Sequence, residues 1–211
     1  MDAAIDQTIS ENQAEAPSFS YEEVAQAITA NRANTLALLD CLRTVQEPLP
    51  FREAEEAVSG ARSMGLTMQT PHALFAILMA HGAVEAIEVP EEEPAQPQES
   101  GEDQPVDYLL HTTDLGLRAL DEFDPLRRFA LLMAAEPENY GSAYGLVLDA
   151  CMNGASRQAV EQALAGHEAL LNPKQIYPGY FISKLETVDG ISWDGMWRTT
   201  EPGQRMRALL A

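Results

Sequence analysis

The sequence predicts a mainly α-helical protein with small β-hairpins, an α+β chain built from two tandem units with the same order of elements. Helix-start signals recur along the chain, and each is followed by apolar residues at helical spacing. Two pairs of short segments with strand-like composition predict hairpins. A seven-residue pattern also occurs twice at an offset of 87 residues, as TTDLGLR and TTEPGQR.

Helix-start signals set the order of the first unit. Residues 1–19 show no hydrophobic periodicity and are predicted to form a disordered tail. Order is expected from Ser20, because Ser20 and Glu23 stand at the spacing of a capping box. Thr70 and Pro71 form an N-cap followed by a proline in the first turn. The helices predicted for this unit cover residues 20–30, 32–45, 52–62, 70–81 and 113–123.

A pair of strands is predicted after Gly82, where the helical period ends. The strands cover residues 84–89 and 106–112, and residues 90–105 join them. Residues 88–107 contain eight acidic residues, four prolines and no basic residue, a composition that cannot pack into a core. The loop is therefore predicted to be mobile, either as a solvated insertion or as a segment that binds a basic partner. The candidate partner-binding residues are Glu91, Glu92, Glu93, Glu99, Glu102 and Asp103.

The second unit repeats this order in a more compact form. Asp124 and Pro125 open its first helix, Ser156 caps its third, and Thr200 caps its last. Of the remaining two helices, the first is predicted to end near Gly154. The predicted helices start at residue 124, cover residues 142–151, 156–165 and 179–187, and end with a C-terminal helix.

The segment ISWDGMWRT, between the last two of these helices, predicts a second hairpin. Asp194 and Gly195 suit a two-residue type I′ turn, because both tolerate positive φ. Such a turn pairs Trp193 with Met196 and places Trp193 and Trp197 on opposite faces, so that one of them is exposed. An irregular register that packs both tryptophans in the core is the alternative. The candidate interface aromatics are Tyr180, Trp193 and Trp197.

The seven-residue pattern has a physical meaning in both copies. Its second threonine, Thr113 or Thr200, can accept a backbone N–H at the start of the last helix of its unit. Its glycine, Gly116 or Gly203, has no Cβ, which would let the start of that helix lie against a neighbouring backbone. The repeat therefore predicts the same strand-to-helix junction in both units.

These segments resemble the strand, wing, strand and helix that end winged-helix proteins, with the pattern hydrophobic-x-Leu-Thr-x-x-Gly. The first copy reads LFAILMAHGAVEAIEV, loop, DYLLHTTDLGLRAL, and the second reads KLETVDGISWDGMWRTTEPGQRMRALL. Thr112 and Thr199 stand where the pattern has leucine. The resemblance implies two tandem winged-helix domains, residues 20–123 with an acidic wing at 90–105 and residues 124–211. In broad plan the chain resembles the acidic tandem winged-helix subunits of bacterial chromosome-condensation complexes.

Charge separates the two predicted domains and bears on DNA binding, which the resemblance suggests. The net charge is -20 and the pI is near 4.3. Residues 1–123 hold 23 acidic and five basic residues, and residues 124–211 hold 10 and eight. Winged-helix domains often place their third helix in the major groove, yet residues 70–81 contain no Lys or Arg. The first domain is therefore expected to repel a phosphate backbone.

The predicted function is a non-enzymatic interaction with another protein, as an adaptor or regulator, or with a second copy of the chain. The acidic first domain would face a basic partner. The alternative is a transcriptional regulator that binds DNA through its second domain, alone or as a dimer. Its candidate nucleic-acid contacts are Lys174, Lys184, Arg198 and Arg205.

No catalytic, metal-binding or cofactor-binding pattern is predicted. The four histidines lack the local spacing of a metal clamp, and no glycine-rich phosphate loop is present. Cys41 and Cys151 are predicted to be buried core residues in a reducing compartment. Residues 1–16 have no basic or apolar stretch typical of a signal peptide, and no apolar run is long enough for a membrane span. A cytoplasmic protein without membrane contacts is predicted.

Overall fold

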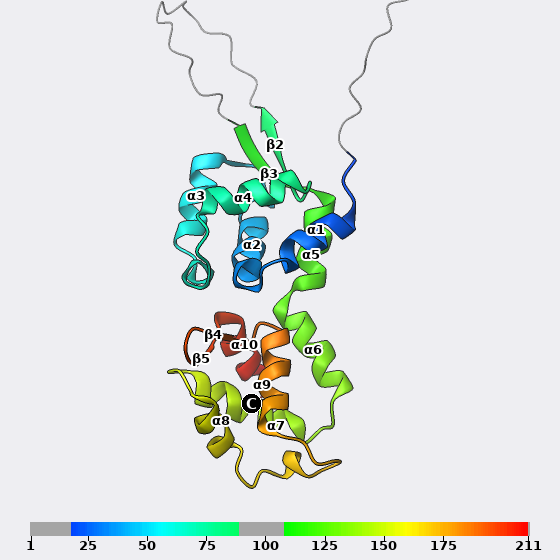
Figure 1. The fold of residues 1–211 in the computed structure, drawn as a ribbon. Helices are drawn as coiled ribbons and strands as arrows, with labels where there is room; N and C mark the ends of the chain where they lie inside the picture. The colour runs from blue at the N-terminus through cyan, green and yellow to red at the C-terminus, as the bar shows by residue number, and fades with distance from the viewer. Residues whose placement is uncertain (1–17, 89–107, 211) are drawn as a thin grey trace, which may run out of the picture.

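The computed structural model describes residues 18–88 and 108–210, which form a mainly helical structure with two small antiparallel sheets (Figure 1). This confirms the predicted α+β class. The α-helices are α1 (Tyr21–Thr29), α2 (Arg32–Thr44), α3 (Phe51–Ser59), α4 (Pro71–Ala80), α5 (Asp114–Phe123), α6 (Pro125–Ala135), α7 (Tyr140–Cys151), α8 (Arg157–Ala163), α9 (Pro178–Thr187) and α10 (Glu201–Leu209). The strands are β1 (Leu49–Pro50), β2 (Val84–Glu88), β3 (Tyr108–Thr112), β4 (Ile191–Trp193) and β5 (Trp197–Thr199).

Six of the predicted helix starts are confirmed by their caps, whereas α7 begins at Tyr140, two residues before its predicted start. At each of the six, the side chain of the N-cap residue accepts a hydrogen bond from the backbone N–H three residues later, which satisfies a donor that the helix leaves free. Ser20 and Glu23 form the complete capping box. The six N-cap residues are Ser20, Thr70, Thr113, Asp124, Ser156 and Thr200.

Three short elements were not predicted. β1 has two residues and includes Pro50, so that it carries no strand pattern in the sequence. Two 3₁₀ helices, Arg62–Leu66 and Glu168–Leu170, follow α3 and α8. α3 ends at Ser59, three residues before its predicted end, because Gly60 is a poor helix former.

Two separate groups of buried side chains form the core. We call residues 18–123 the N-terminal lobe and residues 124–210 the C-terminal lobe, because each core group lies within one of these ranges. Figure 1 shows α1–α5 and the three-stranded sheet in one lobe and α6–α10 with the two-stranded sheet in the other. The largest buried side chains include Phe75 and Leu42 in the first and Phe129, Tyr140 and Tyr144 in the second.

The repeated threonines make the same hydrogen bonds in both lobes. The Thr112 hydroxyl donates to the carbonyl of Leu42 in α2 (2.7 Å), and the Thr199 hydroxyl donates to the carbonyl of Leu148 in α7 (2.6 Å). In both cases the bond ties the end of a strand to the second helix of its lobe.

The threonines that follow also correspond. The Thr113 hydroxyl donates to the carbonyl of Gly82 (2.7 Å), and the Thr200 hydroxyl donates to that of Asp189 (2.5 Å). Gly82 and Asp189 both have positive φ, 73° and 59°. The two junctions therefore share their hydrogen bonds and their backbone conformation.

The repeated glycines lie directly against a neighbouring backbone, as the sequence predicts. A Cβ on Gly116 would overlap the carbonyl oxygen of Ala83, and a Cβ on Gly203 would overlap that of Gly190. These two carbonyl groups are equivalent, because each accepts the backbone N–H of the capping threonine at 3.1 Å. Only glycine fits at either position without moving the backbone.

The prediction of a two-residue type I′ turn in the second hairpin is wrong. Trp193 pairs directly with Trp197, which leaves residues 194–196 as a three-residue loop. A type I′ turn needs positive φ at both central residues, but only Gly195 has it, at 98°. Asp194 instead keeps its carboxylate toward Arg198, with the Arg198 Nε at 2.6 Å.

The register also corrects the predicted placement of the tryptophans. Directly paired residues share a face of a hairpin, so that Trp193 and Trp197 do not point to opposite faces. Their rings pack edge to face, with centroids 4.9 Å apart.

Candidate interaction surfaces

The hairpin of the C-terminal lobe presents apolar side chains to solvent. Trp193 is 56% exposed and Met196 is 42% exposed, while Trp197 is half-buried. We call these three residues the hairpin patch. The pairing of Trp197 with Ala155, just before α8, anchors the strand on which the patch stands. Exposed tryptophans on a fixed element are typical of protein–protein contacts.

Most basic side chains of the C-terminal lobe are neutralised by acidic partners. Arg198 pairs with Asp194, and its hydrogen bond lowers the pKa of that carboxyl below its usual range. Arg207 pairs with Asp149 at 2.8 Å. The arginines of this lobe that form ion pairs are Arg127, Arg128, Arg157, Arg198 and Arg207. Lys174, Lys184 and Arg205 form none with the carboxylates of residues 18–88 and 108–210.

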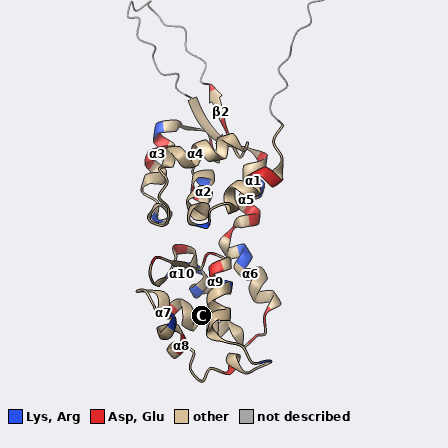
Figure 2. Ribbon diagram, viewed as in Figure 1, with Lys and Arg blue, Asp and Glu red and all other residues tan. Residues whose placement is uncertain are grey.

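Lys and Arg are spread over several elements of both lobes, and α4 carries neither (Figure 2). Of the four predicted nucleic-acid contacts, the structure brings Lys174 and Lys184 to one cavity, whereas Arg198 lies on the hairpin and Arg205 on α10. The predicted acidic contacts from Glu91 to Asp103 lie outside the described residues.

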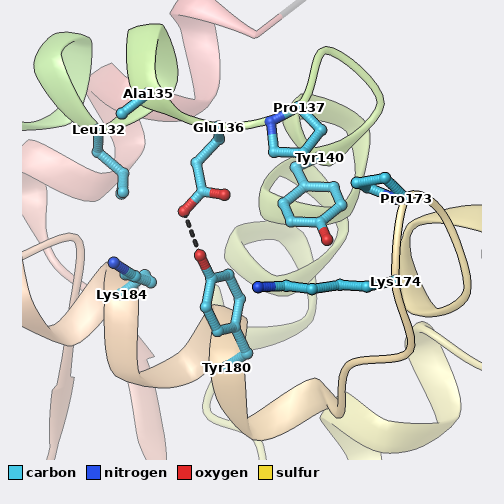
Figure 3. Close-up of a pocket in the computed structure, with 9 residues that line it drawn as sticks. All are labelled: Leu132, Ala135, Glu136, Pro137, Tyr140, Pro173, Lys174, Tyr180 and Lys184. Atoms are coloured by element: carbon cyan, nitrogen blue, oxygen red, sulfur yellow. Dashed lines mark hydrogen bonds between the residues drawn. The ribbon is translucent and has the colours of Figure 1, made fainter.

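The cavity lies between the end of α6 and the start of α9 and has a volume of about 360 Å³ (Figure 3). Glu136 is its central polar residue. The Glu136 carboxylate accepts hydrogen bonds from the hydroxyls of Tyr180 (2.5 Å) and Tyr144 (3.3 Å). Tyr180, predicted as an interface aromatic, is thus a wall of the cavity. The lining residues are Leu132, Ala135, Glu136, Pro137, Tyr140, Pro173, Lys174, Tyr180 and Lys184.

The two tyrosine hydroxyls on Glu136 stay protonated. Burial, with the hydrogen bond and the charge of Glu136, raises the pKa of Tyr180 to about 12. Burial and the nearby Glu136 charge also raise the pKa of Tyr144. Both hydroxyls are therefore hydrogen-bond donors at neutral pH, and they hold the Glu136 carboxylate in place.

Glu136 and Tyr140 were not predicted from the sequence to be residues of a site. Glu136 follows α6 directly and has no local motif, and it meets Tyr180 across 44 positions of the chain. The available signal was the presence of three tyrosines, Tyr140, Tyr144 and Tyr180, in segments with apolar periodicity. A buried tyrosine hydroxyl needs a partner, which predicts a nearby acceptor without saying which one.

Within the described parts of the chain, no group of histidine, cysteine and carboxylate side chains could hold a metal ion. Both cysteines are buried, and burial raises the pKa of Cys41 to about 12 and that of Cys151 to about 11. Neither thiol is therefore activated. The Nε2 atom of His167 lies 3.2 Å from the hydroxyl oxygen of Ser142.

No helix in residues 18–88 and 108–210 has both the length and the apolar character needed to cross a bilayer. Comparison of the chain with protein-family models, with curated proteins and with solved structures finds no match.

Proposed function

We propose that the chain is a non-enzymatic protein of two tandem winged-helix domains, residues 20–123 and 124–211, that acts through protein–protein contacts. The equivalent threonine bonds and glycine contacts in the two lobes support the repeat. The pairing of Leu49 with Leu110 and of Ala155 with Trp197 supports it further, because both place the segment before the third helix against the last strand.

The observation that carries the proposed activity is the chemistry of the second wing. A wing that contacts DNA presents cations to phosphates, whereas this hairpin presents Trp193 and Met196, and its Arg198 is paired with Asp194. The apolar surface suits a protein partner or a second copy of the chain. The acidic wing, residues 90–105, would add selectivity for a basic partner, because complementary charge speeds encounter and rejects acidic surfaces.

Replacing the exposed tryptophan tests this activity. Trp193→Ala is expected to weaken association roughly 30-fold, the effect of losing an aromatic hot spot, with little change in thermal stability. Sedimentation equilibrium of the full chain measures self-association. A photo-crosslinker at position 196 in cells traps a partner that is another protein. Tyr177→Ala, at a side chain 72% exposed outside the hairpin, is the matched control and should associate like the wild type. A monomeric wild type that yields no crosslinked protein would contradict the proposal.

The regulator alternative rests on Lys174, Lys184, Arg198 and Arg205, of which only Arg198 pairs with a carboxylate of residues 18–88 and 108–210, and it is tested with DNA. Titration of labelled genomic fragments at low salt is expected to show no specific, steeply salt-dependent binding, since few cations are available to displace counterions. Tight binding that is lost in the double variant Lys184→Ala/Arg198→Ala would favour the regulator instead.

A further inference from the structure

One polar group in the cavity beside Glu136 is buried without a hydrogen bond. The Tyr140 side chain is 1% exposed, and its hydroxyl has no partner among residues 18–88 and 108–210. The neighbouring hydroxyls of Tyr144 and Tyr180 both donate to Glu136. A buried hydroxyl is almost always bonded, and leaving it unbonded costs stability. Tyr140 therefore offers a donor that the fold itself does not use.

The charges around the cavity do not balance. Lys174 and Lys184 bring two positive charges to its lining, and Glu136 brings one negative charge. No carboxylate in residues 18–88 and 108–210 lies within ion-pair distance of either lysine, and the Lys184 ammonium instead lies 5.5 Å from the centre of the Tyr180 ring. One positive charge is left over, which matches a monoanion.

The other walls are apolar and the space is limited. Leu132, Ala135, Pro137 and Pro173 complete the lining, and a volume of about 360 Å³ lies at the small end of the range for ligand cavities. In Figure 3 the Lys174 ammonium is directed into the cavity that Tyr140 also lines. Lys174 is exposed and has a long, flexible side chain, so that its ammonium can move to meet an anion in the cavity.

We propose that this cavity binds a small monocarboxylic acid with a short apolar body. The carboxylate accepts the Tyr140 hydroxyl hydrogen bond and lies between the ammonium groups of Lys174 and Lys184. The apolar body packs against the leucine, alanine and proline walls. Glu136 does not bind the acid. The hydroxyls of Tyr144 and Tyr180 hold its carboxylate, and its negative charge offsets one of the two lysines.

Calorimetric titration of the full chain with hexanoate tests the proposal. Saturable binding with one site and a Kd on the order of 1 mM is expected. Hexanamide, which has the same apolar body without the charge, should bind at least about tenfold more weakly. Equal affinity for hexanoate and hexanamide, or no saturable hexanoate binding, would overturn the proposal. The hairpin patch does not line the cavity, so that these outcomes are independent of any protein partner.

Two tyrosine variants separate ligand binding from structure. Tyr140→Phe removes the unbonded hydroxyl, so the melting temperature of the free protein should rise by roughly 4 °C while the hexanoate affinity falls about tenfold. Tyr144→Phe removes a hydroxyl that is bonded to Glu136; it should lower the melting temperature and change the hexanoate affinity by less than about twofold. The double variant Lys174→Gln/Lys184→Gln should also lose hexanoate binding while remaining folded. Wild-type affinity in Tyr140→Phe or in the lysine variant would overturn the proposed site.

Discussion

Gly203→Ala is expected to unfold the C-terminal lobe at temperatures where the wild type is folded. The new Cβ would overlap the carbonyl oxygen and carbon of Gly190 and lie 2.9 Å from Thr199 Cγ2. The backbone cannot yield easily, because the Gly190 carbonyl also accepts the Thr200 N–H at 3.1 Å. Relieving the overlap would separate α10 from β4 and break that bond. We expect a loss of at least about 3 kcal/mol in the free energy of unfolding.

Tryptophan fluorescence measures this loss in one lobe alone. The chain has two tryptophans, and both are in the hairpin of the C-terminal lobe. Urea titration followed by fluorescence therefore reports the stability of that lobe. Gly179→Ala is the matched control, because a Cβ there meets nothing within 4 Å and Gly179 lies in α9. The control should be unchanged or stabilised by about 0.5–1 kcal/mol. Equal stability of both variants would show that the α10 junction is not closely packed.

The success of the glycine prediction shows which parts of this fold are encoded locally. Gly116 and Gly203 each follow a capping threonine by three residues, so one short pattern specifies the cap and the close approach together. The helix starts were predictable for the same reason, since a cap and its acceptor lie within one turn. The repeat added a check, because two copies of the pattern had to fit the same junction.

The remaining features depend on contacts between distant segments. In the hairpin, Trp197 also pairs with Ala155, which precedes α8, and Asp194 lacks the positive φ that a two-residue type I′ turn needs. The Glu136 cavity needs α6, α7 and α9 to converge, and no local pattern encodes that convergence. The positive φ of Asp189 was not predicted either. The equivalent residue in the first lobe is Gly82, and glycine is the residue that usually indicates positive φ, whereas aspartate is not.

Arg128→Ala is the second change expected to have a large effect, because it leaves Asp189 buried without its main counter-charge. The Asp189 side chain is 8% exposed, and its carboxylate lies 3.0 Å from Arg128 and 3.8 Å from Arg32 of the N-terminal lobe. Arg128 also donates to the carbonyl of Thr187. Removing one member of a buried pair leaves a desolvated charge. We expect a loss of about 3 kcal/mol at pH 7, the low end of such effects, since Arg32 remains.

The pH dependence identifies the cause of that loss. Burial raises the pKa of Asp189, and the two arginines oppose the rise, so removing Arg128 raises this pKa further. A carboxyl with a raised folded-state pKa binds more protons when folded. Its contribution to stability is thus greatest below its unfolded-state pKa and falls as the pH rises through the folded-state value. The difference between Arg128→Ala and the wild type should therefore be largest at pH 7 and shrink toward pH 4.

Two further variants complete the test of this ion pair by urea titration with tryptophan fluorescence. In the Arg128→Ala background, Asp189→Asn removes the stranded charge and should recover part of the lost stability at pH 7, and the pH dependence of the difference should disappear. Arg157→Ala, at a side chain 74% exposed that pairs with Glu161 on the same helix, is the control and should change stability by less than about 0.5 kcal/mol. If Arg128→Ala were no more destabilising than Arg157→Ala, the buried carboxylate would not depend on Arg128. Arg32, reaching Asp189 from the N-terminal lobe, would then be the arginine that stabilises it.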